Sequence, residues 1–163
     1  MANVMATEAT HARHTVLASS GNLSRLQLPM ETNANGVLIG SSKKTALAIG
    51  DIVRLLRMPK GTLIGLGTDI PISDAFTAGT TIQVGFEYAD GVNDADFPQD
   101  AAFFHAAGST AAVARLNTTP VRKPRILPKD AWVIATIAGA NHAAAGRLDI
   151  LLDVEYQGIR GME

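Results

Sequence analysis

The chain has 163 residues and no cysteine, with 47% hydrophobic residues, 18% charged residues and a formal net charge of −1. This length predicts a single domain, and the lack of cysteine excludes disulfides and thiolate metal sites. The near-zero net charge gives no overall field that would attract nucleic acid or anionic lipid. The low content of charged residues favours self-association, because buried interface cores are depleted of charge.

The N-terminal residues lack the basic start and the continuous apolar core of a secretory signal. No apolar run reaches the length of a membrane span. We therefore expect a chain that folds in the reducing cytoplasm of the cell that makes it, with no membrane partner.

Residues 1–35 are rich in Ala, Thr, Asn and Ser and show little sustained periodicity. Two interpretations stay open, a frayed terminus and an extended arm that becomes ordered on a neighbouring subunit. Glu8, His11 and His14 would share one face of a helix, but the partner helices of a di-iron site are missing. We assign residues 1–35 to an extended arm and residues 36–163 to the globular domain.

Short strands are predicted along the rest of the chain, because apolar and polar residues alternate or form short apolar runs there. The predicted strands are residues 37–40, 51–58, 62–66, 80–88, 125–138 and 147–156, with weaker candidates at 111–116 and 119–124. The turn Pro59-Lys-Gly61 suggests that 62–66 returns alongside 51–58, and the last two strands suggest a long antiparallel pair. Residues 101–107 fit either a short helix capped by Asp100 or a bulged strand.

Six to eight short strands separated by turns predict an all-β fold, a jelly-roll-like β-sandwich. The strand order does not follow from the pattern. The Pro-Lys turn at residues 58–64 has a weak echo at 127–133, which two equivalent corners of a sandwich would explain.

Candidate sites for chemistry are weak throughout the chain. Residues 36–45 lack the spacing of a phosphate loop, and no serine lies in the Gly-x-Ser-x-Gly context of an esterase. His105 is interpreted as a packed or interfacial residue, and His142 as part of a flexible loop tip. The acidic loop from Asp90 to Asp100 leaves a cation site open, although its spacing matches no EF-hand. We predict no enzymatic activity and no cofactor.

A basic cluster lies at Arg122, Lys123, Arg125 and Lys129. It can protect a sheet edge from aggregation or dock on an acidic patch of a partner. Nucleic acid is a poorer fit, because no aromatic residues are interleaved for base stacking.

Three segments together resemble the head decoration (cement) proteins of tailed bacteriophages: KTALAIGDIVRLLRMPKG at 44–61, ILPKDAW at 126–132 and LDILLDVEY at 148–156. The resemblance implies a small jelly-roll or β-tulip-like domain on the exterior of a virion. It also implies homodimers or homotrimers that clamp the major capsid protein of the same particle. It does not indicate the symmetry axis or the surface that meets the shell.

A clamp of this kind needs contacts across a symmetry axis, which an arm and a sheet edge would supply. The candidate partner-binding residues are Arg13 and Arg25 in the arm and Arg122, Lys123 and Arg125 at the edge. The alternative function is a carbohydrate- or receptor-binding jelly roll of a phage tail or surface protein. Few aromatic residues are available for a sugar platform.

Overall fold

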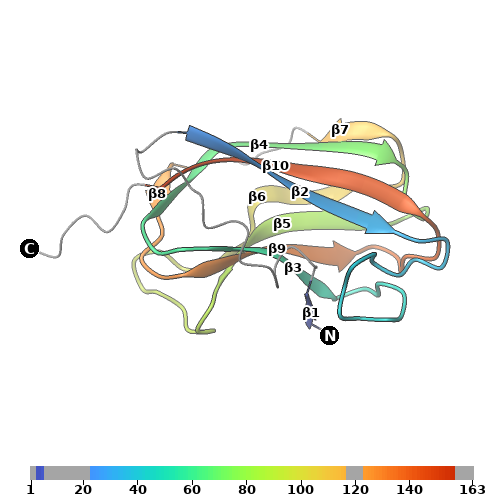
Figure 1. Cartoon of the computed structure of the whole chain (residues 1–163), viewed down its shortest axis with the longest axis horizontal. Helices are drawn as coiled ribbons and strands as arrows, with labels where there is room; N and C mark the ends of the chain where they lie inside the picture. Colours follow the sequence, from blue (N-terminus) through green and yellow to red (C-terminus); the bar gives the residue numbers. More distant parts are fainter. Residues whose placement is uncertain (1–2, 6–22, 117–122, 157–163) are drawn as a thin grey trace, which may run out of the picture.

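The computed structural model describes residues 3–5, 23–116 and 123–156, which form two packed β-sheets without a helix (Figure 1). The strands are β1 (Asn3–Met5), β2 (Leu23–Thr32), β3 (Ile52–Met58), β4 (Thr62–Asp74), β5 (Thr81–Tyr88), β6 (Asp100–Ser109), β7 (Ala114–Leu116), β8 (Arg125–Ile126), β9 (Ala131–Ala138) and β10 (Gly146–Tyr156). The predicted all-β sandwich is confirmed.

The strand order is that of a jelly roll. Sheet A has the order β1-β3-β9-β5-β6, and sheet B has the order β2-β10-β4-β7, with β8 added to β4. From β2 to β10 the chain changes sheet at every connection except β5–β6 and β7–β8. All the pairs are antiparallel except β1–β3, which is parallel. Two antiparallel sheets connected in this way, with β1 added at the edge of sheet A, form the double Greek key of a jelly roll.

Both predicted strand pairings are wrong. The last two long strands, β9 and β10, lie in different sheets, since β9 pairs with β3 and β5 while β10 pairs with β2 and β4. Likewise β3 and β4 are consecutive in the chain but belong to opposite sheets. An alternating pattern identifies a half-buried strand, but it carries no information about which strand lies beside it.

Residues 23–32, which we assigned to the arm, form strand β2 of sheet B. They pair with β10 without a register shift, from Leu23 opposite Glu155 to Thr32 opposite Gly146. The edge of the folded domain therefore lies before residue 35, and residues 6–22 fall outside the described residues. Residues 37–40 were predicted as a strand but form turns with one isolated bridge.

The ambiguous segment after the acidic loop is the bulged strand β6 rather than a helix. Its register with β5 shifts twice, between Ile82 and Val84 and between Val84 and Phe86. Gly85 permits the second shift, because a Cβ atom there would lie 2.0 Å from the carbonyl oxygen of Asp100. Such bulges bend an edge strand and discourage pairing with other chains.

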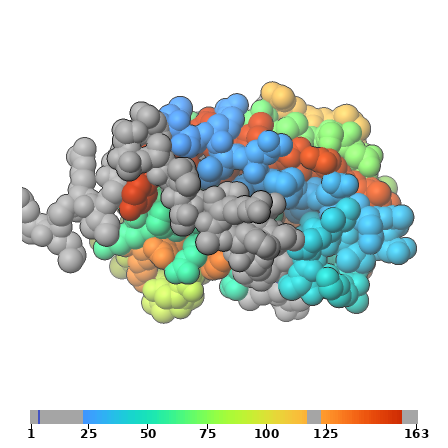
Figure 2. All heavy atoms as spheres, viewed as in Figure 1, coloured from blue at the N-terminus to red at the C-terminus, as the bar shows by residue number. Residues whose placement is uncertain are grey.

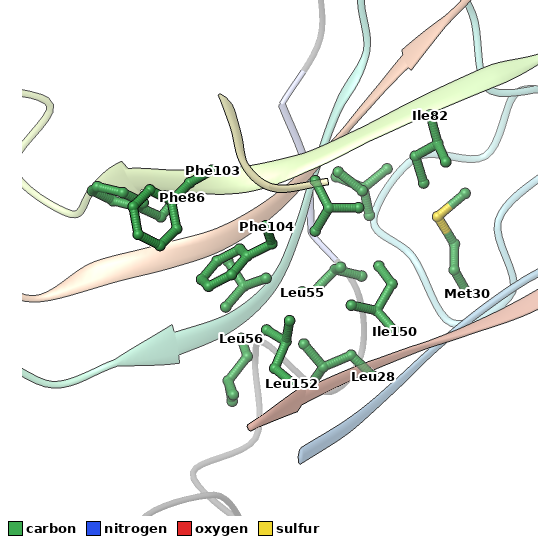
Figure 3. Packing of buried hydrophobic residues seen from close by; sticks show 14 of the residues in the cluster. Leu28, Met30, Leu55, Leu56, Ile82, Phe86, Phe103, Phe104, Ile150 and Leu152 are labelled. Atoms are coloured by element: carbon green, nitrogen blue, oxygen red, sulfur yellow. The ribbon is translucent and has the colours of Figure 1, made fainter. Parts of the chain in front are cut away.

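The core fills the space between the sheets (Figure 3). Leu28, Ile150 and Leu152 of sheet B face Leu55 and Phe104 of sheet A. Each fully buried side chain of this size contributes about 1.5–3 kcal/mol of transfer free energy. Five aromatic rings pack against one another at one end of this core: Phe86, Tyr88, Phe97, Phe103 and Phe104.

Candidate functional site

The loops gather at the two ends of the sandwich, and we name these the charged end and the isoleucine end. The charged end consists of residues 59–61, 89–99 and 123–130, at the left of Figure 1. Two backbone hydrogen bonds join its loops, from the Gly61 N–H to the Leu127 carbonyl at 2.9 Å and from the Ala89 N–H to the Asp130 carbonyl at 2.9 Å. The two Pro-Lys turns therefore meet at one end, as the expected corners of a sandwich.

Two of the predicted partner-binding residues lie at the charged end. The Arg125 guanidinium donates to the Asp96 carbonyl at 2.9 Å and lies 5.0 Å from the centroid of the Phe97 ring. Lys123 is exposed and has no ion pair among the described residues. Arg13 and Arg122 lie outside the described residues.

Arg25 lies on the outer face of sheet B, in the half nearest the charged end. Its guanidinium donates two hydrogen bonds to the Asp153 carboxylate, at 2.8 and 2.9 Å. The hydrogen bond from Arg25 lowers the pKa of Asp153, and the same pair raises the pKa of Arg25. Its charge is thus already matched within the chain, which leaves Lys123 as the freer cation.

A largely apolar row of four residues, interrupted by one glutamate, crosses the outer face of sheet B next to Arg25. The register places Leu23 of β2 opposite Glu155 of β10, Glu155 opposite Leu63 of β4, and Leu63 opposite Ile126 of β8. Leu23 is 63% exposed and Ile126 is 46% exposed. This row cannot be recognised in the sequence, because its members come together only through the register of four strands.

The acidic loop satisfies its own backbone. The carboxylates of Asp90 and Asp94 accept hydrogen bonds from the N–H groups of Val92, Asp96 and Phe97. The Val92 hydrogen bond, followed by that from the Lys129 ammonium, lowers the pKa of Asp90. Within the described residues no three His, Asp or Glu side chains are grouped to hold a metal ion. The geometry of this loop therefore does not support the cation site that the sequence left open at Asp90 to Asp100.

A buried tyrosine anchors the acidic loop to the core. The Tyr88 hydroxyl donates to the Phe97 carbonyl, and burial raises the pKa of Tyr88 to about 12. The Lys129 ammonium lies 5.4 Å from the centroid of the Tyr88 ring and 3.1 Å from the Asp90 carboxylate. The polar surface of the charged end is therefore attached to the hydrophobic core through Tyr88.

The isoleucine end is at the right of Figure 1 and is almost free of charge. It consists of residues 33–51, 75–80, 110–113 and 139–145. The charged residues in these four ranges are Lys43, Lys44 and Asp51. Lys43 and the 4% exposed Asp51 form an ion pair, and the Lys44 ammonium donates to the Ser41 carbonyl at 3.1 Å. Ile39 and Ile49, which give this end its name, are 56% and 57% exposed.

His142 is buried at the isoleucine end, which corrects the prediction of a flexible loop tip. It is 2% exposed, and its ring centroid lies 4.8 Å from that of Phe76. The backbone N–H of His142 donates to the Leu47 carbonyl at 2.8 Å. Burial lowers the pKa of His142 to about 4. His105, predicted to be a packed or interfacial residue, is 1% exposed and therefore packed within the chain.

The sequence matches no protein-family model and no curated protein. A chain from the capsid of Ralstonia phage GP4 shares the fold with a TM-score of 0.66 and 17% identity, covering 96% of this chain and 99% of that one. A chain from the capsid asymmetric unit of cyanophage Pam1 has a TM-score of 0.50 and 14% identity, covering 83% and 85%. These similarities show that the jelly roll occurs in chains of phage capsids. Among the described residues no helix could span a membrane.

Proposed function

We propose that this protein is a structural, non-enzymatic component of a phage virion that binds the outside of the capsid shell and cements neighbouring capsomers. The observation that carries the proposal is the match to the capsid chain of phage GP4 along nearly the whole of both chains. The resemblance of the sequence to head decoration proteins points to the same role. In this role the major capsid protein of the same particle is the partner.

We assign the shell contact to the charged end and to the residues that enter the fold there. Residues 1–22 lead into Leu23, which stands in the apolar row with Ile126, and residue 122 leads into the exposed Lys123. The apolar side chains of this row and Lys123, which has no ion pair among the described residues, offer both buried area and orientation to a protein partner. A second contact through residues 6–22 would raise avidity without requiring either contact to be strong.

The burial of the aromatic side chains argues against the alternative function, a carbohydrate-binding module. All five phenylalanines are buried, and so is Tyr88, which leaves the half-buried Trp132 and Tyr156. Sugar recognition commonly uses the exposed face of an aromatic ring. The outer surface of the sandwich offers little of that kind.

The test is binding of the purified protein to phage shells that lack it. We expect it to sediment with the shells and to saturate at a simple fraction of the copies of the major capsid protein. No sedimentation with shells of its own phage would reject the shell-binding role. Saturation at a few copies per particle would favour the tail or receptor-binding alternative.

A pair of charge reversals tests the assigned contact. Lys123→Glu combined with Arg125→Glu should lower shell occupancy at least tenfold while the melting temperature stays within a few degrees. The matched control is Lys60→Glu, an exposed lysine of the same end on the turn between the two sheets. Equal losses in both proteins would indicate a general electrostatic attraction and contradict a contact at the β8 edge.

Residues 6–22 are tested by replacing residues 8–20, which include Arg13, with a Gly-Ser segment of the same length. This change keeps β1, whose Val4 is completely buried in the core. We expect weaker shell binding from a protein that melts as before. Unchanged occupancy would remove the N-terminal segment from the contact.

A further inference from the structure

We propose that the isoleucine end is the surface through which copies of this protein contact one another. The partner is a second copy of the chain, and the contact forms without the shell. The inference deepens the proposed multi-copy role, on which it rests, by giving self-association a surface opposite the assigned shell contact. It is carried by charge, by exposed apolar area and by the rigidity of one loop.

The charge pattern of the isoleucine end suits contact between identical surfaces. Lys43 and Asp51 neutralise each other in a pair whose side chains are 19% and 4% exposed. Within the part of the chain that the structure describes, Lys44 is the one charged side chain of these loops outside an ion pair. In a closed symmetric contact, residues near the axis face their own copies, so equal charges there would repel. The adjoining strand ends add the ion pair of Glu31 with Arg147 and the exposed Asp74. The loops themselves carry little net charge, so a contact between their copies avoids much of this repulsion.

Apolar area is exposed on the same surface. Ile39 and Ile49 expose more than half of their surface, and they belong to the loop 33–51, which forms the light-blue and cyan corner of the molecule in Figure 2. The neighbouring residues 143–145 are exposed alanines. Large exposed apolar side chains surrounded by small residues are typical of interface cores, from which charged residues are depleted.

The loop that carries these isoleucines is held in place before any partner arrives. The Ile39 N–H donates to the Glu31 carbonyl at 2.8 Å, and the Ile49 N–H donates to the Asn141 side-chain oxygen at 2.9 Å. Gly36 adopts a φ of +71°, and a Cβ atom there would lie 2.2 Å from the His142 carbonyl oxygen. A loop longer than about 12–15 residues that is nevertheless ordered is usually functional. Its order lowers the entropic cost of forming an interface.

The opposite end of the sandwich is a poorer surface for self-contact. Its loops expose Lys60 and Lys123, neither of which has an ion pair within the described part of the chain, together with the carboxylates of the acidic loop. Two copies meeting there would bring equal charges together unless the register matched each with an opposite charge. The difference in charge between the two ends therefore selects the isoleucine end.

The experiment is sedimentation equilibrium of the purified full-length protein over a wide range of concentrations, without shells. We expect the unmodified protein to form dimers or trimers, and the double variant Ile39→Asp with Ile49→Asp to associate at least tenfold more weakly. Val92→Asp is the matched control, because Val92 is 59% exposed but lies at the charged end. It should associate like the unmodified protein. Lys44→Glu, which keeps both isoleucines, tests whether a charge reversal alone alters association.

A monomeric unmodified protein at all concentrations would overturn the inference. So would a double variant that associates normally, or a Val92→Asp protein that dissociates as much as the double variant. If the unmodified protein is monomeric and the double variant loses shell binding, the isoleucine end faces the shell instead. Self-association through this end without any shell binding would leave the inference standing and reject the proposed function. Thermal melting of each variant shows that the sandwich stays folded.

Discussion

The loops of the charged end and of the isoleucine end are both held together by hydrogen bonds, but the two ends differ in where their carboxylates lie. At the charged end the carboxylates stay at the surface, where Asp130 is 41% exposed and pairs with the 56% exposed Arg57. At the isoleucine end the carboxylate of Asp51 is buried beneath the loop and pairs with Lys43. One sandwich thus presents a polar surface at one end and a nearly uncharged surface at the other.

This difference predicts unequal costs for the same chemical change. Asp51→Asn leaves the Lys43 ammonium without its partner in a largely buried position, so we expect the free energy of unfolding to fall by about 3 kcal/mol. Asp130→Asn removes an exposed ion pair and should cost about 1 kcal/mol or less. Urea denaturation measures both values, and similar losses at the two ends would contradict the comparison.

The pH dependence of stability should also come from the isoleucine end. The pKa of His142 is lowered to about 4 in the folded protein, below its usual value of 6.5, so folding favours the neutral ring. The stability held by this ring is fully present above pH 6.5 and is lost as the pH falls from 6.5 towards 4. We expect a loss of about 2 kcal/mol by pH 4.5.

The carboxylates titrate in part of the same range, so the measurement needs a reference protein. His142→Gln keeps a polar side chain of similar size without a titrating ring. The difference in unfolding free energy between the unmodified protein and this variant should change between pH 7 and pH 4.5. A constant difference would show that His142 does not gain a proton on unfolding.

Tyr88→Phe tests how the charged end is tied to the core. The variant removes the hydroxyl that donates to the Phe97 carbonyl and leaves this buried acceptor unpaired. We expect a loss of about 1 kcal/mol in urea denaturation. Tyr156→Phe is the control, because the Tyr156 hydroxyl makes no hydrogen bond within the described residues, and it should cost much less. Equal losses of unfolding free energy in the two variants would show that the Tyr88 hydroxyl does not stabilise the fold through this hydrogen bond.

The smallest effect is expected for Lys129→Gln. Its ammonium group pairs with the half-exposed Asp90, so the loss of unfolding free energy should be smaller than that for Tyr88→Phe. Salt screens surface pairs, and the difference should shrink further at 1 M sodium chloride. A loss that persists in high salt would point to the contact with the Tyr88 ring instead of the ion pair.

Local alternation revealed β5 and β10, because both have one buried and one outer face that can be recognised from residue type alone. In β2 the inward residues Leu28 and Met30 follow the same rule, but Pro29 between them obscured it. The pairing of the strands could not be predicted from the sequence, for a different reason. A jelly roll joins strands that are distant in the chain, and no local pattern records which sheet a strand enters.

The candidate surfaces were less predictable than the strands. Ile39 lay in a segment with the composition of a strand, and its exposure follows from the turn that the loop makes after Thr32. His142 lies in an alanine-rich loop, and its burial depends on Phe76, which is far away in the sequence. The pairing of Lys43 with Asp51 likewise depends on the folded path of the loop. Side chains that meet only through tertiary structure leave no pattern of spacing.

The position of β10 has a consequence for the order of events during synthesis. Strand β10, the last of the described strands, lies between β2 and β4, so neither of these strands has its main neighbour until residues 146–156 emerge from the ribosome. Folds with such distant pairings form slowly, because the entropy cost of closing long loops comes before the stabilising contacts between the strands can form. We expect sheet B to be completed only once residues 146–156 have emerged, and nascent chains released before residue 146 to aggregate.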